Sequence, residues 1–143
     1  MESLAYIGMA CALCLSALGS GLGTNAAGQS AVGGWKKCYA AGKPAPFIMV
    51  AFAGAPLTQT IYGFLLMTFI KNALGSANPV LCLFIGILGG IAIGVSAMFQ
   101  GKVAACAADA LAETGKGTAN YFIVIGIVET VALFTLVFSL LML

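Results

Sequence analysis

The fold of this protein is decided by residues 117–143, Gly117-Thr-Ala-Asn-Tyr-Phe-Ile-Val-Ile-Gly-Ile-Val-Glu129-Thr-Val-Ala-Leu-Phe-Thr-Leu-Val-Phe-Ser-Leu-Leu-Met-Leu143. Glu129 is the only charged residue in this stretch. A helix needs about 20 mainly apolar residues to cross the hydrocarbon core of a bilayer. The stretch therefore predicts a membrane-spanning helix that carries one carboxyl group at membrane depth.

Three further windows, residues 3–35, 44–70 and 72–101, contain no charged residue at all. Only 7% of the 143 residues are charged and the mean hydropathy is +1.10, whereas a soluble domain carries about 25% charged residues. This composition excludes a soluble fold. We expect an all-α membrane protein with four transmembrane helices, at about residues 4–32, 46–70, 79–112 and 120–143.

The composition also excludes several classes of site. The chain has no histidine and no arginine, so histidine-based catalysis, histidine metal sites and arginine-based readout of nucleic acid are ruled out. The glycine-rich segments 19–23 and 114–118 lack the spacing of nucleotide-binding loops. We therefore predict a non-catalytic protein with no organic cofactor and no nucleic-acid partner.

The lysines predict the orientation in the bilayer. Five of the six lie near the first and third connections, and one lies at the other side: Lys36, Lys37, Lys43, Lys102 and Lys116 against Lys71. Positive charges near span ends favour the cytoplasm. We expect the loops 33–45 and 112–119 to be cytoplasmic and both termini to be outside, in a bacterial or archaeal cell membrane.

The second half of the chain resembles the first. Residues 56–64 align with residues 126–134, so that Gln59 matches Glu129, and an offset of 75 aligns the first arms more weakly. We expect two tandem, parallel helical hairpins, residues 1–72 and 73–143, of which only the second carries a membrane carboxylate. This parallel arrangement differs from the inverted repeats of many transporters.

Both first arms carry small residues at every fourth position, which allow helix backbones to approach closely in lipid. The stripes are Gly8, Ala12, Ser16 and Ser20 in one arm and Gly86, Gly90 and Gly94 in the other. Packing within a four-helix bundle would explain them. Because the second arms are bulkier, the stripes also predict a homo-oligomeric ring with crowded inner helices.

Glu129 is the principal functional candidate, because an ionisable group at membrane depth is costly. Polar groups that could serve it are Thr58, Gln59 and Tyr62 in the second span and Gln100 in the third. Pro56 frees a backbone carbonyl in the preceding turn, near Ala55 or Phe52. Such an all-oxygen set around one negative charge suits Na⁺, although H⁺ would need only the carboxylate. Counted along its helix, Gln100 lies nearer the loops than Glu129, so its contribution is left open.

At this point the chain resembles a known family, the proteolipid (K or c-type) subunits of V-type and archaeal-type rotary ATPases. The resemblance rests on the tandem hairpins, Pro56-Leu-Thr-Gln-Thr-Ile-Tyr-Gly-Phe64, Gln100-Gly-Lys102 and Val128-Glu129-Thr130. This sequence departs from the family's Leu-Pro-Gly-Thr-Gln form, because it has Ala55 and Leu57 in the first and third positions. In sodium-carrying members, the resemblance implies Na⁺ at Glu129, Thr58, Gln59, Gln100 and the Ala55 carbonyl, with Tyr62 hydrogen-bonded to the carboxylate.

The resemblance also implies a mechanism and partners. Identical subunits form a ring in the lipid bilayer, and Glu129 carries Na⁺, or H⁺, past a stator membrane subunit that supplies an arginine. A central-stalk subunit at the cytoplasmic loops couples rotation to ATP hydrolysis or synthesis. Two alternatives remain from the residues alone. They are a small four-helix proton-coupled multidrug exporter, and a purely structural membrane scaffold that would leave Glu129 unexplained.

Overall fold

The computed structural model describes residues 2–143, which form helices and no β-strand. The elements are α1 (Glu2–Ala40), α2 (Met49–Gly54), the 3₁₀ turn η1 (Ala55–Leu57), α3 (Thr58–Asn72), α4 (Pro79–Thr114) and α5 (Thr118–Leu140). The elements α2, η1 and α3 together form one rod, Met49–Asn72. With α1, α4 and α5, the described residues contain four rods that are long and apolar enough to cross a membrane. This confirms the predicted fold class, and the protein is an integral membrane protein.

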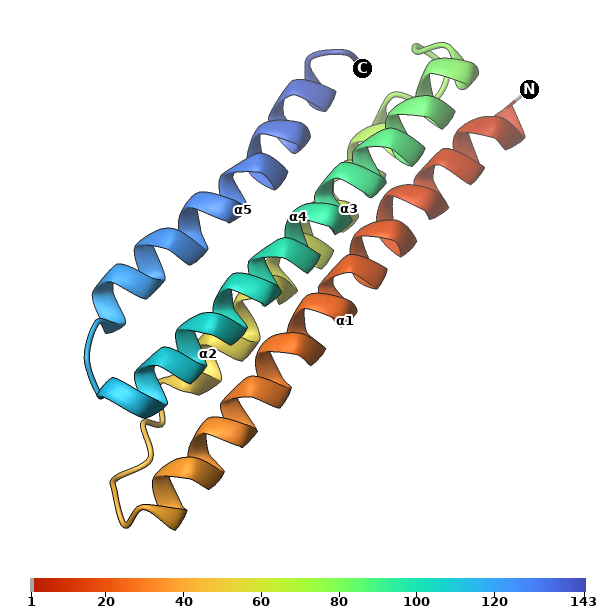
Figure 1. The fold of residues 1–143 in the computed structure, drawn as a ribbon. Helices are drawn as coiled ribbons and strands as arrows, with labels where there is room; N and C mark the ends of the chain where they lie inside the picture. Colours follow the sequence, from red (N-terminus) through yellow and green to blue (C-terminus); the bar gives the residue numbers. More distant parts are fainter. Residues whose placement is uncertain (1) are drawn as a thin grey trace.

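The rods form two hairpins that point the same way (Figure 1). α1 and α4 run in parallel from the end that holds both termini, and α3 and α5 return to that end. The connections 41–48 and 115–117 lie together at the opposite end, here named the loop end; the end with the termini is named the terminal end. Both predicted cytoplasmic connections therefore lie on one side.

The predicted first loop, residues 33–45, is wrong for most of its length, because α1 continues to Ala40. A bilayer boundary does not end a helix, and the 39 residues of α1 extend for about 58 Å, well beyond the hydrocarbon core. The predicted loop 112–119 likewise shrinks to residues 115–117, where Gly115 and Gly117 have φ of 65° and 90°. Positive φ suits glycine, so the chain reverses within three residues.

The predicted span over 46–70 is present as one rod, Met49–Asn72, but its helix type changes within it. The helix begins at Met49 and changes to a 3₁₀ turn over Ala55–Leu57 before α3 starts. Pro56 has no backbone N–H, and its ring crowds the carbonyl four residues earlier. The local change of helix type follows from that single residue, and it lies directly beside Thr58 and Gln59.

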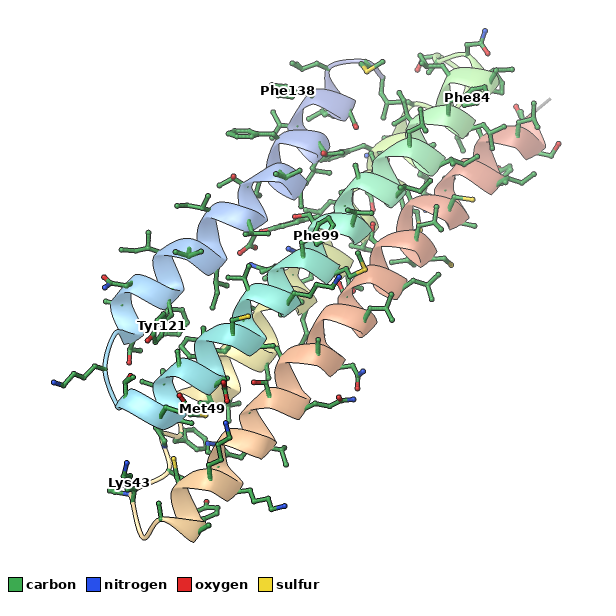
Figure 2. All side chains as sticks on the ribbon, in the orientation of Figure 1. Lys43, Met49, Phe84, Phe99, Tyr121 and Phe138 are labelled. Carbon is green, nitrogen blue, oxygen red and sulfur yellow. The ribbon has the colours of Figure 1, made fainter. Side chains whose placement is uncertain are left out.

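α1 and α4 pack through the small-residue stripes, as predicted for packing within the bundle. A Cβ built on Gly19 would overlap the backbone of Gly94, and one on Gly86 would overlap the backbone of Gly8. α4 is the most buried helix, whereas α5 buries only Ile125, Ala132 and Leu136. α5 therefore presents a largely apolar outer face, from which Phe138 projects away from the bundle (Figure 2).

The loop end carries most of the exposed charged residues. Lys37 on α1 donates to Asp109 on α4 at 2.7 Å, with side chains 55% and 54% exposed, and Lys43 lies at the tip of the connection (Figure 2). Exposed pairs of this kind stabilise a fold by about 0–1 kcal/mol. Asp109 and Glu113 thus lie on a solvated helix end, which agrees with the sequence-based interpretation.

Candidate functional site

Glu129 lies partly buried on α5 and is held by two side chains from two other helices. Tyr62 of α3 donates its hydroxyl hydrogen to Glu129 Oε1 at 2.7 Å. Gln100 of α4 donates through Nε2 to Glu129 Oε2 at 3.2 Å. Both carboxylate oxygens therefore accept a hydrogen bond, and hydrogen bonds to an ionised acceptor are stronger than neutral ones.

The two glutamines extend this network into the core. Gln59 Nε2 donates to Gln100 Oε1 at 2.8 Å, and both side chains are fully buried. The Thr58 hydroxyl lies 3.1 Å from Gln59 Oε1 and 3.0 Å from the Ala55 carbonyl oxygen. A continuous chain of hydrogen bonds thus links α3, α4 and α5 through Thr58, Gln59, Gln100 and Glu129. The structure brings together all five side chains that the sequence singled out, which are Thr58, Gln59, Tyr62, Gln100 and Glu129.

Gln100 reaches Glu129 although the residue count places it nearer the loop end. The reason is helix direction: side chains lean toward the N-terminus of their own helix, and α4 and α5 run in opposite directions. Gln100 therefore leans toward the terminal end and Glu129 toward the loop end, so the two converge. Gln100 Nε2 also donates to the Ile125 carbonyl at 3.1 Å, which places the Glu129 carboxylate beside the turn that contains Ile125.

The Ala55 carbonyl lies at the edge of the network, as the proline suggested, but it is not free. It accepts the backbone N–H of Thr58 in the 3₁₀ turn, and the Thr58 hydroxyl lies within hydrogen-bond distance of it. A carbonyl oxygen has two lone pairs. A bound cation would therefore have to replace the Thr58 hydroxyl hydrogen at this oxygen.

Ser96 also belongs to the site, and the sequence analysis missed it. Its hydroxyl donates to the Val128 carbonyl at 3.0 Å, and the residue is 3% exposed. Ser96 lies four residues before Gln100, so both occupy one face of α4. That spacing was the signal that could have found it. Ser96 holds the peptide directly before Glu129 against α4.

For a Glu129 that binds a cation, we expect Ser96→Ala to weaken that binding modestly. The Val128 carbonyl keeps its helical acceptor role, so the loss is one buried hydrogen bond, about 1 kcal/mol. If that loss falls on the ion-bound state, the Na⁺ concentration that half-protects Glu129 from carbodiimide rises about fivefold. Ser30→Ala is the matched control, because Ser30 makes a similar bond to the Ala105 carbonyl at 2.6 Å. An equal shift in both variants would show that Ser96 has no specific role.

The arrangement offers oxygen donors of the kind that a small hard cation or a proton would require. Within residues 2–143, no group of three or more His, Cys, Asp or Glu side chains is placed to hold a metal ion. The site instead offers one carboxylate with amide and hydroxyl oxygens, the donor type that hard cations prefer. Its single charge matches a monovalent ion.

The chain is similar to known subunits of ATP synthases. Residues 83–142, which contain most of α4 and all of α5, match the family of the ATP synthase C subunit. The chain is 32% identical over 143 residues to A-type ATP synthase subunit K of Methanocaldococcus jannaschii, in an alignment that covers 98% of the chain. The chain spans 61% of the length of that relative. These matches make the chain similar to ATP synthase C and K subunits, and they favour the rotor interpretation over the exporter.

Proposed function

We propose that this chain is the ion-carrying subunit of a rotor ring in an A/V-type rotary ATPase, and that Glu129 carries Na⁺. The observation that carries this proposal is the network around Glu129. Both carboxylate oxygens accept hydrogen bonds, from Tyr62 and Gln100, which suits an ionised carboxylate. An ionised group at membrane depth is costly without a counter-charge, and a bound monovalent cation supplies one.

The polar neighbours support Na⁺ over H⁺. In the hydrogen-bonded network, Gln59 presents its amide nitrogen to Gln100 Oε1. Rotation of the Gln59 amide by half a turn would present its oxygen to the Gln100 oxygen instead. The Thr58 hydroxyl oxygen and the Ala55 carbonyl lie at the edge of this group. A proton carrier needs only the carboxylate, so the additional oxygens are explained by a cation.

Rotation follows from the exchange of this ion. Identical chains would form the ring, and each Glu129 would pass a stator subunit whose arginine displaces Na⁺ through one half-channel before another ion loads. The counter-charge must come from that partner, because this chain has no arginine. The central stalk would bind at the loop end and transmit rotation to ATP hydrolysis or synthesis. Gln59 stands where a carboxylate would be needed in the first hairpin, so each chain carries one ion per four helices.

The test is carbodiimide labelling of the purified chain over a range of pH, with and without NaCl. We expect modification at Glu129 that NaCl suppresses and KCl suppresses less. Labelling that depends on pH but not on NaCl would replace Na⁺ with H⁺ as the transported ion. No labelling at Glu129 under any condition would contradict an ion-carrying role for this carboxylate.

A further inference from the structure

Ser20 on α1 has a buried hydroxyl group that makes no hydrogen bond within residues 2–143. The residue is only 1% exposed. A serine inside a helix often donates to the carbonyl four residues earlier, and Ser16 does so to Ala12 at 2.7 Å. Ser20 makes no such bond, although a buried polar group without a partner destabilises a fold. The group that this hydroxyl serves must therefore lie on a neighbouring helix.

The contact between α1 and α3 places Ser20 opposite Gln59. The two helices run in opposite directions and pack against each other (Figure 1). A Cβ built on Gly63 would overlap the side chain of Ser16, so these two residues face each other at close range. Ser20 follows Ser16 by four residues, on the same face of α1. Gln59 precedes Gly63 by four residues, on the same face of α3. One helical turn along the contact therefore brings Ser20 opposite Gln59.

A second contact supports the same register from the other side. A Cβ built on Gly23 would lie 2.9 Å from the Pro56 Cβ. Gly23 follows Ser20 by three residues, which keeps it on the same side of α1. Pro56 precedes Gln59 by three residues in the rod that ends in α3. Ser20 and Gln59, both buried, thus lie between two close contacts of the same two rods.

The Gln59 amide makes two hydrogen bonds, and neither involves Ser20. Its nitrogen donates to Gln100 Oε1 at 2.8 Å, and its oxygen lies 3.1 Å from the Thr58 hydroxyl. An amide nitrogen carries two hydrogens, so one of them has no acceptor in these bonds. A hydroxyl oxygen can accept a hydrogen bond while it donates its own hydrogen elsewhere. Ser20 and the Gln59 amide are therefore complementary groups on facing helices.

We propose that Ser20 is a positioning residue for the cation site, and that it holds Gln59 with the amide oxygen turned toward the cation. The proposal rests on the proposed function of Glu129 as the Na⁺ carrier. Rotation of the Gln59 amide by half a turn brings its oxygen to the Gln100 oxygen. Two facing oxygens carry like partial charges and repel each other, so this orientation needs a cation between them.

The rotated amide loses its bond to Gln100 and needs acceptors for two hydrogens. Its nitrogen then stands where the oxygen stood, so the Thr58 hydroxyl can accept one of them. The Ser20 hydroxyl accepts the other after a change of the serine rotamer, which is a step between staggered positions. Ser20 thus favours the orientation that binds the cation, and it touches no ion itself. Protonation of Glu129 requires no rotation of Gln59, so Ser20 leaves it unaffected.

The experiment compares Ser20→Ala with the unaltered chain in detergent. It measures the NaCl concentration that half-protects Glu129 from carbodiimide, and the labelling rate without NaCl over a range of pH. We expect the half-protecting concentration to rise about tenfold in Ser20→Ala, because one buried amide hydrogen is left without an acceptor. The pH dependence of labelling without NaCl should stay unchanged, because a proton needs only the carboxylate.

Three further variants separate the position of Ser20 from its bulk and burial. Ser16→Ala removes a buried hydroxyl one turn away that is already bonded within α1. Thr24→Val removes another described hydroxyl that is buried without a partner, one turn nearer the loop end. We expect both variants to stay within about twofold of the unaltered chain. Ser20→Cys keeps most of the bulk, but sulfur is a weak acceptor, so this variant should resemble Ser20→Ala.

Several outcomes would contradict the role of Ser20 alone. An unchanged half-protecting concentration in Ser20→Ala would overturn it, and so would an equal rise in Ser16→Ala or Thr24→Val. Full protection in Ser20→Cys beside a rise in Ser20→Ala would reduce the effect to lost bulk. A shift in the pH dependence without NaCl would show that the substitution disturbs the carboxylate itself. If NaCl fails to protect even the unaltered chain, sodium carriage fails first, and the role of Ser20 fails with it.

Discussion

Replacing Glu129 with glutamine is expected to reduce ion-coupled ATP turnover in the assembled complex to background. Glutamine nearly preserves the shape of the side chain but cannot carry a negative charge. Where its amide nitrogen faces Gln100 Nε2, two donors face each other, and a buried polar group left unpaired costs about 1–3 kcal/mol. The measurement is Na⁺-stimulated ATP hydrolysis in membranes, together with carbodiimide labelling of the chain.

Glu113→Gln is the matched control for this substitution. Glu113 lies near the end of α4 with its side chain 62% exposed, 3.4 Å from Lys37, so its charge is solvated and outside the network. We expect this variant to keep both coupled turnover and Na⁺-suppressed labelling. Coupled turnover in Glu129→Gln at the level of Glu113→Gln would contradict the whole proposed mechanism.

The second large effect concerns the contact between α1 and α4. Gly19→Ala is expected to destabilise the bundle by about 3 kcal/mol, because its methyl group would overlap the backbone of Gly94 and no rotamer change can relieve a backbone overlap. Gly21→Ala is expected to be neutral or stabilising by up to about 1 kcal/mol, since alanine is the better helix former. The same substitution two residues apart thus gives effects of opposite sign.

Thermal unfolding of the detergent-purified variants, followed by circular dichroism, measures this difference. A Cβ on Gly21 would meet no atom within 4 Å, so Gly21→Ala controls for the removal of a glycine from α1. Equal melting temperatures for the two variants would show that the helices separate enough to accept a methyl group. The close approach of α1 and α4 would then not be a requirement of the fold.

Most of the fold could be predicted from the sequence because the bilayer restricts what a chain can do. Backbone polar groups must be paired inside each span, so an uncharged window of sufficient length has to be a helix. The ends of those helices could not be predicted in the same way. α1 continues past the charged pair Lys36 and Lys37 to Ala40, because charges mark the edge of the lipid and do not stop a helix.

The residues of the site also fall into two groups, those that the sequence could indicate and those that only the structure revealed. Glu129, Gln59 and Tyr62 could be singled out because polar side chains are scarce in lipid-facing windows. The pairing of Gln100 with Glu129 could not be predicted by counting residues, because it depends on two side chains that lean toward each other from antiparallel helices. Ser96 was missed because a serine in a membrane helix usually bonds within its own helix.

The amino-acid sequence by itself determined that this is a four-helix membrane protein with one carboxylate in the membrane, because hydropathy and charge act residue by residue. The tertiary structure alone decided what surrounds that carboxylate. It joined Thr58, Gln59, Gln100 and Glu129 into one hydrogen-bonded chain, and it brought the Tyr62 hydroxyl to the same carboxylate. Those properties depend on how helices face one another, and the direction and packing of whole helices are not contained in any single stretch of sequence.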